Sequence, residues 1–156
     1  MDLFAHRSLT GIFSSAVMLF IVSGCGDHRV RTYPVEMSVK YKGTQETIPG
    51  GGVELQPKNP LDREHRVSCV GRILANGTVV FTTFKPGDGA VEGVHRVMLY
   101  EPGIPHNWDI ESQGPPPPTI PARYKTFATS GLTIEVTPGG ENRLDIEIEK
   151  PQAPRR

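Results

Sequence analysis

Apolar and polar residues alternate without a break in Val35-Glu36-Met37-Ser38-Val39-Lys40-Tyr41-Lys42 and again in Leu144-Asp145-Ile146-Glu147-Ile148-Glu149. Successive side chains of a β-strand point to opposite faces, so this period of two gives one buried face and one solvated face. The two stretches therefore predict the first and last strands of a β-domain, at residues 35–42 and 144–149.

Five further strands are predicted between these two. Asn76-Gly77 separates two of them, and both residues accept a positive φ, which favours a tight hairpin. No sustained helical period follows Gly24. Seven short strands with frequent turn residues are typical of a sandwich, and we expect an all-β fold with a seven-stranded Greek-key β-sandwich. The five strands are expected at Val53–Gln56, Arg66–Leu74, Thr78–Phe84, Val94–Glu101 and Leu132–Val136.

The alternation also predicts which side chains form the core. Apolar residues at every second position of a strand share one face, and that face must be removed from water. We expect twelve side chains to be buried together, namely Met37, Val39, Leu55, Val67, Phe81, Val97, Leu99, Ile134, Val136, Leu144, Ile146 and Ile148.

Length and composition restrict the class of protein. The chain has 156 residues, enough for one ordinary domain, and its 17 basic and 17 acidic residues give a formal charge of zero. A balanced chain has no basic field for nucleic acid. Two cysteines exclude a disulfide framework and a four-cysteine zinc site.

The first 24 residues have the features of an export signal. Gly11–Val22 is an apolar stretch of twelve residues, and a helix of that length rises about 18 Å, well short of the hydrocarbon thickness of a bilayer. Val22-Ser23-Gly24-Cys25 follows it and resembles the lipobox of bacterial lipoproteins. The resemblance implies lipidation of Cys25 on sulfur, cleavage before it, acylation of its amine and a membrane anchor facing the periplasm or the cell surface.

An ordinary signal with a coincidental cysteine is the alternative to the lipobox. In that case Cys25 becomes available for an envelope disulfide with Cys69. With lipidation, Cys69 is a lone cysteine on a strand face with Val67, where core packing is favoured over a reactive thiol. Residues 25–34 are expected to be a lipidated tether, 35–150 the domain, and 151–156 a flexible tail.

Two blocks of sequence extend the resemblance to the domain itself. They are Thr83-Phe84-Lys85-Pro86-Gly87-Asp88-Gly89-Ala90 with Gly93-Val94-His95-Arg96-Val97, and Ile120-Pro121-Ala122-Arg123-Tyr124 with Thr129-Ser130-Gly131-Leu132-Thr133-Ile134-Glu135-Val136. Together with the lipobox, the chain resembles small bacterial lipoproteins that carry a carboxypeptidase regulatory-like (transthyretin-like) domain. The resemblance implies a seven-stranded β-sandwich and no established activity.

The chain departs from that family at three places. Leu74-Ala75-Asn76-Gly77 stands where members carry an acidic turn, His95 stands where they often have tyrosine, and the segment Pro102–Pro118 is longer than usual. The catalytic signatures of related enzymes are also missing, since no histidine is followed three residues later by the glutamate of zinc carboxypeptidases.

Candidate chemical groups are few, and each has a structural alternative. No zinc-protease, serine-hydrolase or phosphate-loop motif occurs. Asp88 in a Gly-rich loop is one oxygen donor group where calcium takes six to eight oxygens, which favours a structural loop. His95, flanked on its face by Val97, is interpreted as a core histidine.

One segment, 102–122, interrupts the strand pattern as a Pro-rich insertion. Its proline run, Pro115–Pro118, is expected to be extended and to act as a stiff spacer or as a docking ligand. Trp108, the only tryptophan, either pins the loop to the domain or stacks on a sugar ring beside Tyr124 or Phe127. Trp108 and Tyr124 are therefore the candidate binding residues.

The sequence predicts a non-enzymatic, membrane-anchored envelope lipoprotein that acts as a structural or interaction module. The alternative is a surface carbohydrate-binding module that uses loop aromatics. No cofactor, catalytic residue or metal site is expected. The expected partners are membrane lipid, through acylated Cys25, and an envelope protein or a glycan, but no nucleic acid; inner and outer membrane both stay open.

Overall fold

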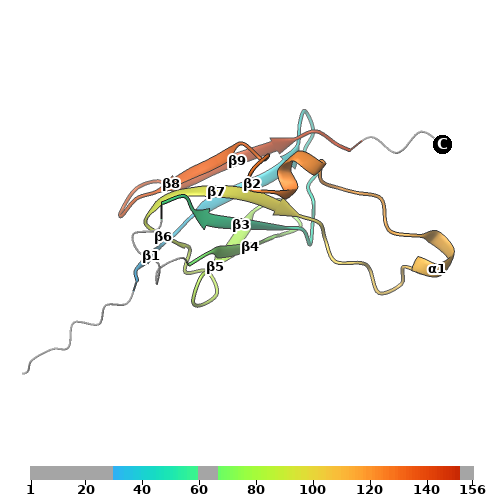
Figure 1. Ribbon diagram of the computed structural model, residues 1–156, viewed down its shortest axis with the longest axis horizontal. Helices are drawn as coiled ribbons and strands as arrows, with labels where there is room; N and C mark the ends of the chain where they lie inside the picture. The colour runs from blue at the N-terminus through green and yellow to red at the C-terminus, as the bar shows by residue number, and fades with distance from the viewer. Residues whose placement is uncertain (1–29, 60–66, 152–156) are drawn as a thin grey trace, which may run out of the picture.

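The computed structural model describes residues 30–59 and 67–151, and within them almost all regular structure is β-strand (Figure 1). An all-β fold is thereby confirmed. Helix is confined to one turn, α1 (Ile110–Gln113), and a short 3-10 segment, η1 (Ala122–Lys125). The strands are β1 (Thr32–Tyr33), β2 (Glu36–Tyr41), β3 (Gly52–Pro57), β4 (Cys69–Ile73), β5 (Val79–Thr82), β6 (Ala90–Val91), β7 (Gly93–Tyr100), β8 (Leu132–Val136) and β9 (Arg143–Ile148).

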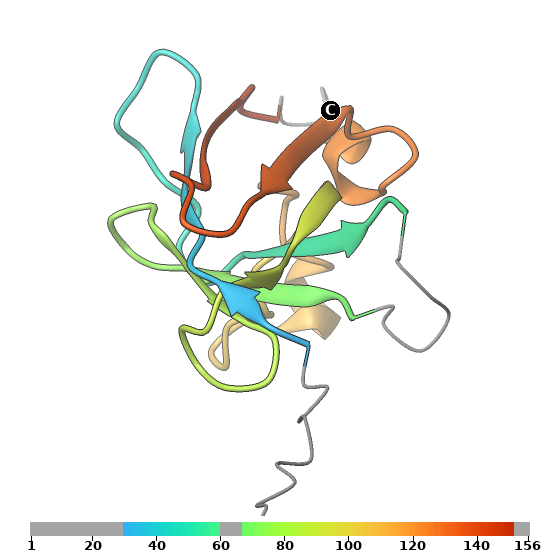
Figure 2. The ribbon, with the colours of Figure 1, turned by 90° about the vertical axis from the view of Figure 1, so that its left-hand side faces the viewer.

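The strands form one large sheet and two small ones. Five antiparallel strands lie in the order β5-β4-β3-β7-β8, while β2 pairs with β9 and β1 pairs with β6. A single β-bridge between Ser38 and Thr78, the residue before β5, brings β2 beside the start of β5. Viewed from the end at which β1 lies, the sheets surround a common interior (Figure 2).

The first and last predicted strands are neighbours, and they run parallel. The register pairs Met37 with Leu144, Val39 with Ile146, and Tyr41 with Ile148. Because the alternation of both strands is in phase at this register, their apolar side chains point to the same side. The β2–β9 ladder thus joins the two ends of the domain. On its polar face, Ser38 Oγ–H donates to Asp145 Oδ1 at 2.6 Å.

The predicted core is largely confirmed. Ten of the twelve expected side chains are buried, while Leu144 is only partly buried and packs at the edge of the cluster. Val67 is a correction: it precedes β4 rather than lying within it, and it is also only partly buried. Residues outside the seven predicted strands complete the core, and they include Ile48, Ala90, Ile120 and Tyr124.

The hairpin at Asn76-Gly77 forms, but with a different turn from the one expected. Only Gly77 has a positive φ, of 85°, and Asn76 does not. Gly77 N–H donates to Leu74 O at 2.9 Å, and Leu74 N–H donates to Thr78 O at 2.8 Å. This pattern is a three-residue connection with glycine in the left-handed position. Asn76 instead uses its side-chain oxygen to accept from Thr78 N–H at 3.1 Å.

Two strands were not expected, because each has only two residues. β1 lies in the segment expected to be a tether and pairs with β6, with Tyr33 opposite Ala90. The pairing needs a glycine at position 89, where φ is +79° and a Cβ atom would lie 1.9 Å from Tyr33 O. The ordered domain therefore begins before residue 35.

Candidate functional site

The Pro-rich insertion forms an arm that leaves the body of the domain. We call residues 101–119 the arm; it starts at the end of β7, passes through α1 and returns toward η1. Figure 1 shows that α1 lies at the opposite end of the molecule from β1. The arm and the first described strand, β1, thus lie at opposite ends of the domain.

Hydrogen bonds within the arm hold its outer half together. Trp108 N–H donates to Pro105 O at 2.9 Å, and the indole Nε1–H donates to Gly114 O at 2.8 Å. Asp109 caps α1, accepting from Ser112 Oγ at 2.6 Å and Glu111 N–H at 3.0 Å. These contacts, from the Ser112 hydroxyl first, lower the pKa of the Asp109 carboxyl. Trp108 consequently stabilises the arm through hydrogen bonds to other residues of the arm.

The base of the arm is closed by Glu101. Its carboxylate accepts from Thr119 N–H at 3.0 Å, Thr119 Oγ1–H and Ile120 N–H at 3.3 Å, and pairs with Lys125 Nζ at 2.5 Å. Burial raises the pKa of this carboxyl, but the contacts with Lys125, Thr119 and Ile120 outweigh burial and hold it below its ordinary value. Glu101 therefore joins the outgoing and returning chains of the arm.

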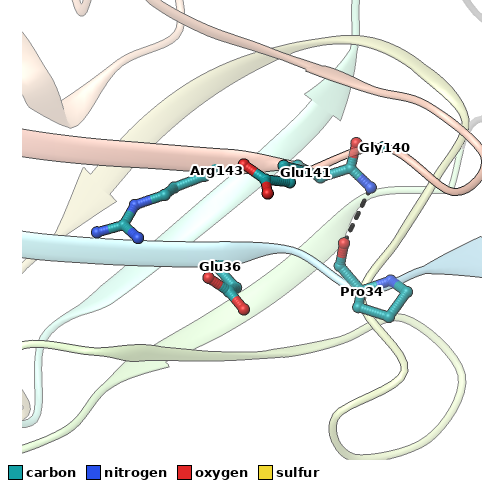
Figure 3. A pocket seen from close by; sticks show the side chains of 6 residues that line it. Pro34, Glu36, Gly140, Glu141 and Arg143 are labelled. Atoms are coloured by element: carbon teal, nitrogen blue, oxygen red, sulfur yellow. Dashed lines mark hydrogen bonds between the residues drawn. The ribbon is translucent and has the colours of Figure 1, made fainter.

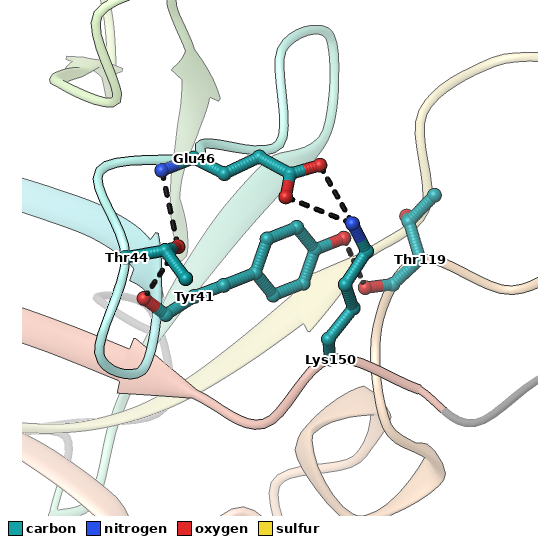
Figure 4. Close-up of polar contacts among 5 residues, drawn as sticks. All are labelled: Tyr41, Thr44, Glu46, Thr119 and Lys150. Atoms are coloured by element: carbon teal, nitrogen blue, oxygen red, sulfur yellow. Dashed lines mark hydrogen bonds and ion pairs between the residues drawn. The ribbon is translucent and has the colours of Figure 1, made fainter.

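Tyr41 fixes the returning chain to β2. Its hydroxyl donates to Thr119 O at 2.8 Å, and the Lys150 ammonium lies 5.5 Å from its ring centroid (Figure 4). Lys150 is in turn 2.8 Å from Glu46 Oε2. Burial, followed by the nearby Glu46 charge, raises the pKa of the Tyr41 hydroxyl, which keeps it as a neutral donor.

A cavity of about 380 Å³ lies within the arm, and Lys125 of η1 also lines it. Trp108 and Pro116–Pro118 form much of its wall, and the side chains of Glu101, Thr119 and Lys125 reach it from the base. Trp108 is half-buried there. The cavity thus combines an aromatic ring and a proline run with a few polar groups, which is typical of small ligand-binding clefts.

The two candidate aromatic residues lie in different surroundings. Trp108 lines the cavity, whereas Tyr124 is 6% exposed and belongs to the core. The Tyr124 hydroxyl accepts from Arg123 at 2.5 Å and lies 3.5 Å from Glu149 Oε2, just after β9. Its ring is covered by the Arg123 guanidinium, 4.5 Å from the centroid. Tyr124 therefore ties η1 to the end of β9 and does not line the cavity beside Trp108.

A second, more polar cavity of about 250 Å³ lies near the start of β2 (Figure 3). Glu36, Glu141 and Arg143 surround it. Asn142 also lines it; its Nδ2 donates to Pro34 O at 3.0 Å, and its Oδ1 accepts from Thr137 N–H at 2.8 Å. Asn142 thereby fastens the β8–β9 turn to the start of β2, which is a structural role.

The remaining candidate groups are part of the framework. Asp88 accepts from the N–H groups of Thr83, Phe84 and Lys85 at 2.8–3.1 Å, so the Gly-rich loop is organised around its carboxylate. Cys69 is fully buried, and its Sγ–H donates to Gly89 O at 3.1 Å. Burial raises the pKa of this thiol to about 11, which keeps it uncharged and unreactive at neutral pH.

His95 is fully buried as well. Its Nε2 lies 2.8 Å from Val91 O, and its Nδ1 has no hydrogen-bond partner in the described part of the chain. Burial lowers the pKa of the imidazole, more than the contact with Val91 raises it. The ring is therefore neutral in the fold, with Nε2–H as the donor and Nδ1 bare.

Several expectations concern residues beyond those described. Cys25, the export signal and residues 152–156 lie outside residues 30–59 and 67–151. Inside those ranges no helix is long and apolar enough to cross a membrane, and no cluster of three or more metal-ligating side chains occurs. The Glu101–Lys125–Thr119 junction was missed, because neither periodicity nor a motif connects residues so far apart in sequence.

In comparisons with known proteins, no family model, no curated protein and no solved structure matches the chain.

Proposed function

We propose that this protein is a non-enzymatic, membrane-anchored binding domain of the bacterial cell envelope. The observation that carries the proposal is that β1 and the arm lie at opposite ends of the molecule (Figure 1). The strand β1 follows the lipobox cysteine in sequence, and the cavity lies in the arm. A lipid anchor at Cys25 then presents the arm away from the membrane surface.

The distance from the anchor is short. Six residues separate Cys25 from Thr32, where β1 starts, and a chain of that length spans at most about 25 Å when extended. The domain is therefore held close to the membrane while the arm points outward. Inner and outer membranes both suit this arrangement.

Binding rather than catalysis is supported by the surroundings of the reactive side chains. His95 and Cys69 are both fully buried, so neither presents a nucleophile or a base to a substrate. Asp88 and Glu101 are saturated with hydrogen bonds from their own loops. The Greek-key β-sandwich is part of the same proposal, and the common core of the five-stranded sheet and the β2–β9 pair supports it.

A glycan is the alternative ligand. The half-buried Trp108 ring in the cavity favours it, because an aromatic face matches the apolar face of a pyranose. In that case the protein is a surface carbohydrate-binding module, with Trp108 as its stacking residue and without a contribution from the buried Tyr124.

Metabolic labelling with a fatty acid tests the anchor. We expect the wild-type protein to incorporate the label and to partition with membranes, and Cys25→Ala to do neither. Cys69→Ala is the matched control, because it removes the other cysteine and leaves the lipobox intact. Labelling and membrane retention of Cys25→Ala would refute the anchor.

Replacement of residues 103–117 by a short Gly-Ser linker tests the arm. Because Glu101 and Thr119 remain, the base of the arm can still close, and a change in loop length costs only about 0.6 kcal/mol per doubling. We expect cross-linked partners recovered with the wild-type protein from membranes to be lost, at an unchanged melting temperature. Recovery of the same partners with the shortened arm would rule the arm out as the binding region.

A further inference from the structure

The polar groups around the arm cavity are already bonded to one another. The indole N–H of Trp108 is used by Gly114 O, and both the amide and the hydroxyl of Thr119 are used by Glu101. Lys125 Nζ is also paired with Glu101. A saccharide brings many hydroxyl groups that lose water on binding and need new partners. The cavity therefore suits an apolar group better than a sugar ring.

The proline side of the cavity offers hydrogen-bond acceptors and no donors. Proline has no N–H, and within the described residues no donor reaches the carbonyls of Pro116, Pro117 or Pro118. Proline runs are recognised in the extended form by surfaces that supply aromatic rings together with N–H or O–H donors. An extended peptide supplies donors through its backbone amides.

The arm is acidic. Residues 101–119 contain three carboxylates, Glu101, Asp109 and Glu111, and no lysine or arginine. Glu101 is paired with Lys125 at the base, whereas Asp109 and Glu111 are exposed at α1. This charge attracts a cationic partner and disfavours an acidic one.

We propose that the arm cavity binds an extended segment of a partner protein in which an aromatic residue is flanked by lysine or arginine. The aromatic ring enters between Trp108 and Pro116–Pro118, the segment's backbone amides donate to the proline carbonyls, and its basic side chains face Asp109 and Glu111. This inference rests on the proposed function, because it names the ligand class of the same arm.

The emission of Trp108 is a direct reporter, since it is the only tryptophan of the chain. The probe is the capped peptide Gly-Lys-Phe-Lys-Gly, added to the full-length protein in detergent. We expect a saturable change in emission at millimolar peptide. Gly-Lys-Ala-Lys-Gly and Gly-Glu-Phe-Glu-Gly should bind about tenfold more weakly, because the first lacks the ring and the second reverses the charge.

A matched pair of variants locates the charge effect. Glu111→Gln should weaken binding of Gly-Lys-Phe-Lys-Gly by about two- to fivefold at low salt. Glu135→Gln removes an exposed carboxylate from β8, on the body of the domain, and should leave the affinity unchanged. Equal effects of the two substitutions would show that only net charge matters and would overturn the assignment to the arm.

Two other outcomes overturn the proposal. One is a saturable response of Trp108 to N,N′-diacetylchitobiose with none to the peptides, which assigns the cavity to glycans. The other is no response to any probe up to about 10 mM, roughly tenfold above the millimolar dissociation constant expected for Gly-Lys-Phe-Lys-Gly. If the peptides fail while replacement of 103–117 still abolishes partner recovery, this inference falls and the proposed function stands.

Discussion

Ile148 provides a quantitative test of the parallel β2–β9 pair. Its side chain is fully buried at the end of β9, opposite Tyr41, whereas Leu144 on the same strand is only partly buried at the edge of the core. The two side chains have the same number of carbon atoms. Truncation of each to alanine therefore removes equal apolar bulk from two different degrees of burial.

The expected costs follow from that difference. Ile148→Ala removes three buried carbon groups, worth about 0.8 kcal/mol each in transfer free energy, and leaves a cavity in a closely packed interior. We expect a loss of about 3–4 kcal/mol in the free energy of unfolding, within the range found for buried isoleucine. Leu144→Ala should cost about 1–2 kcal/mol, because water reaches that position before and after the substitution.

Urea unfolding followed by far-UV circular dichroism measures both losses. Tryptophan emission is unsuitable here, because Trp108 lies in the arm and reports on the cavity. The dependence on urea concentration should be similar for the two variants, so that the midpoint alone carries the change in stability. Equal losses, or a larger loss for Leu144→Ala, would refute the register and the burial of β9.

Two further predictions concern the corner formed by β1, β6 and β7. Burial lowers the pKa of His95 below its ordinary value of 6.5. As the pH falls, the imidazole is therefore protonated in the unfolded chain before it is protonated in the folded chain. The contribution of His95 to stability is complete above pH 6.5 and is lost as the pH falls below that value. His95→Leu should reduce the difference in unfolding free energy between pH 7.5 and pH 5.5, and an unchanged difference would contradict the assignment. Gly89→Ala should cost clearly more than the roughly 1–2 kcal/mol of left-handed strain expected for Gly87→Ala, since a Cβ at Gly89 meets Tyr33 O at 1.9 Å and one at Gly87 meets nothing within 4 Å. Thermal unfolding of the two alanine variants tests this, and equal melting temperatures would count against the close approach of β1.

The strands most clearly encoded in the sequence are those with uninterrupted alternation. The expected bounds of the strand at Leu132–Val136 agree with β8, and the faces of β2, β7 and β9 are as expected. The signal at Asn76-Gly77 identified the hairpin but not its turn, because glycine alone takes the positive φ and asparagine hydrogen-bonds to Thr78 instead.

The candidate site could be recognised from the sequence only in part. The proline run and Trp108 mark the arm, because proline cannot donate to a sheet and a long insertion cannot join its ladder. Grouping Trp108 with Tyr124 as candidate binding residues rested on composition. The structure separates them by role, since Tyr124 packs into the core beside η1 while Trp108 bonds to the carbonyl of Gly114.

The sequence by itself determined which strand side chains face inward and showed that a Pro-rich insertion interrupts the strand pattern, and its lipobox predicts an anchor. The expected insertion, 102–122, runs past the arm into Ile120, which is buried in the core, and into the start of η1. Only the tertiary structure decided that β2 and β9 run parallel, that β1 pairs with β6, and that Glu101 joins the two chains of the arm. The physical reason is that alternation specifies the face of a strand, whereas every backbone carries the same donors and acceptors. The choice of partner and direction therefore depends on how distant segments pack together, and the cavity exists only once they do.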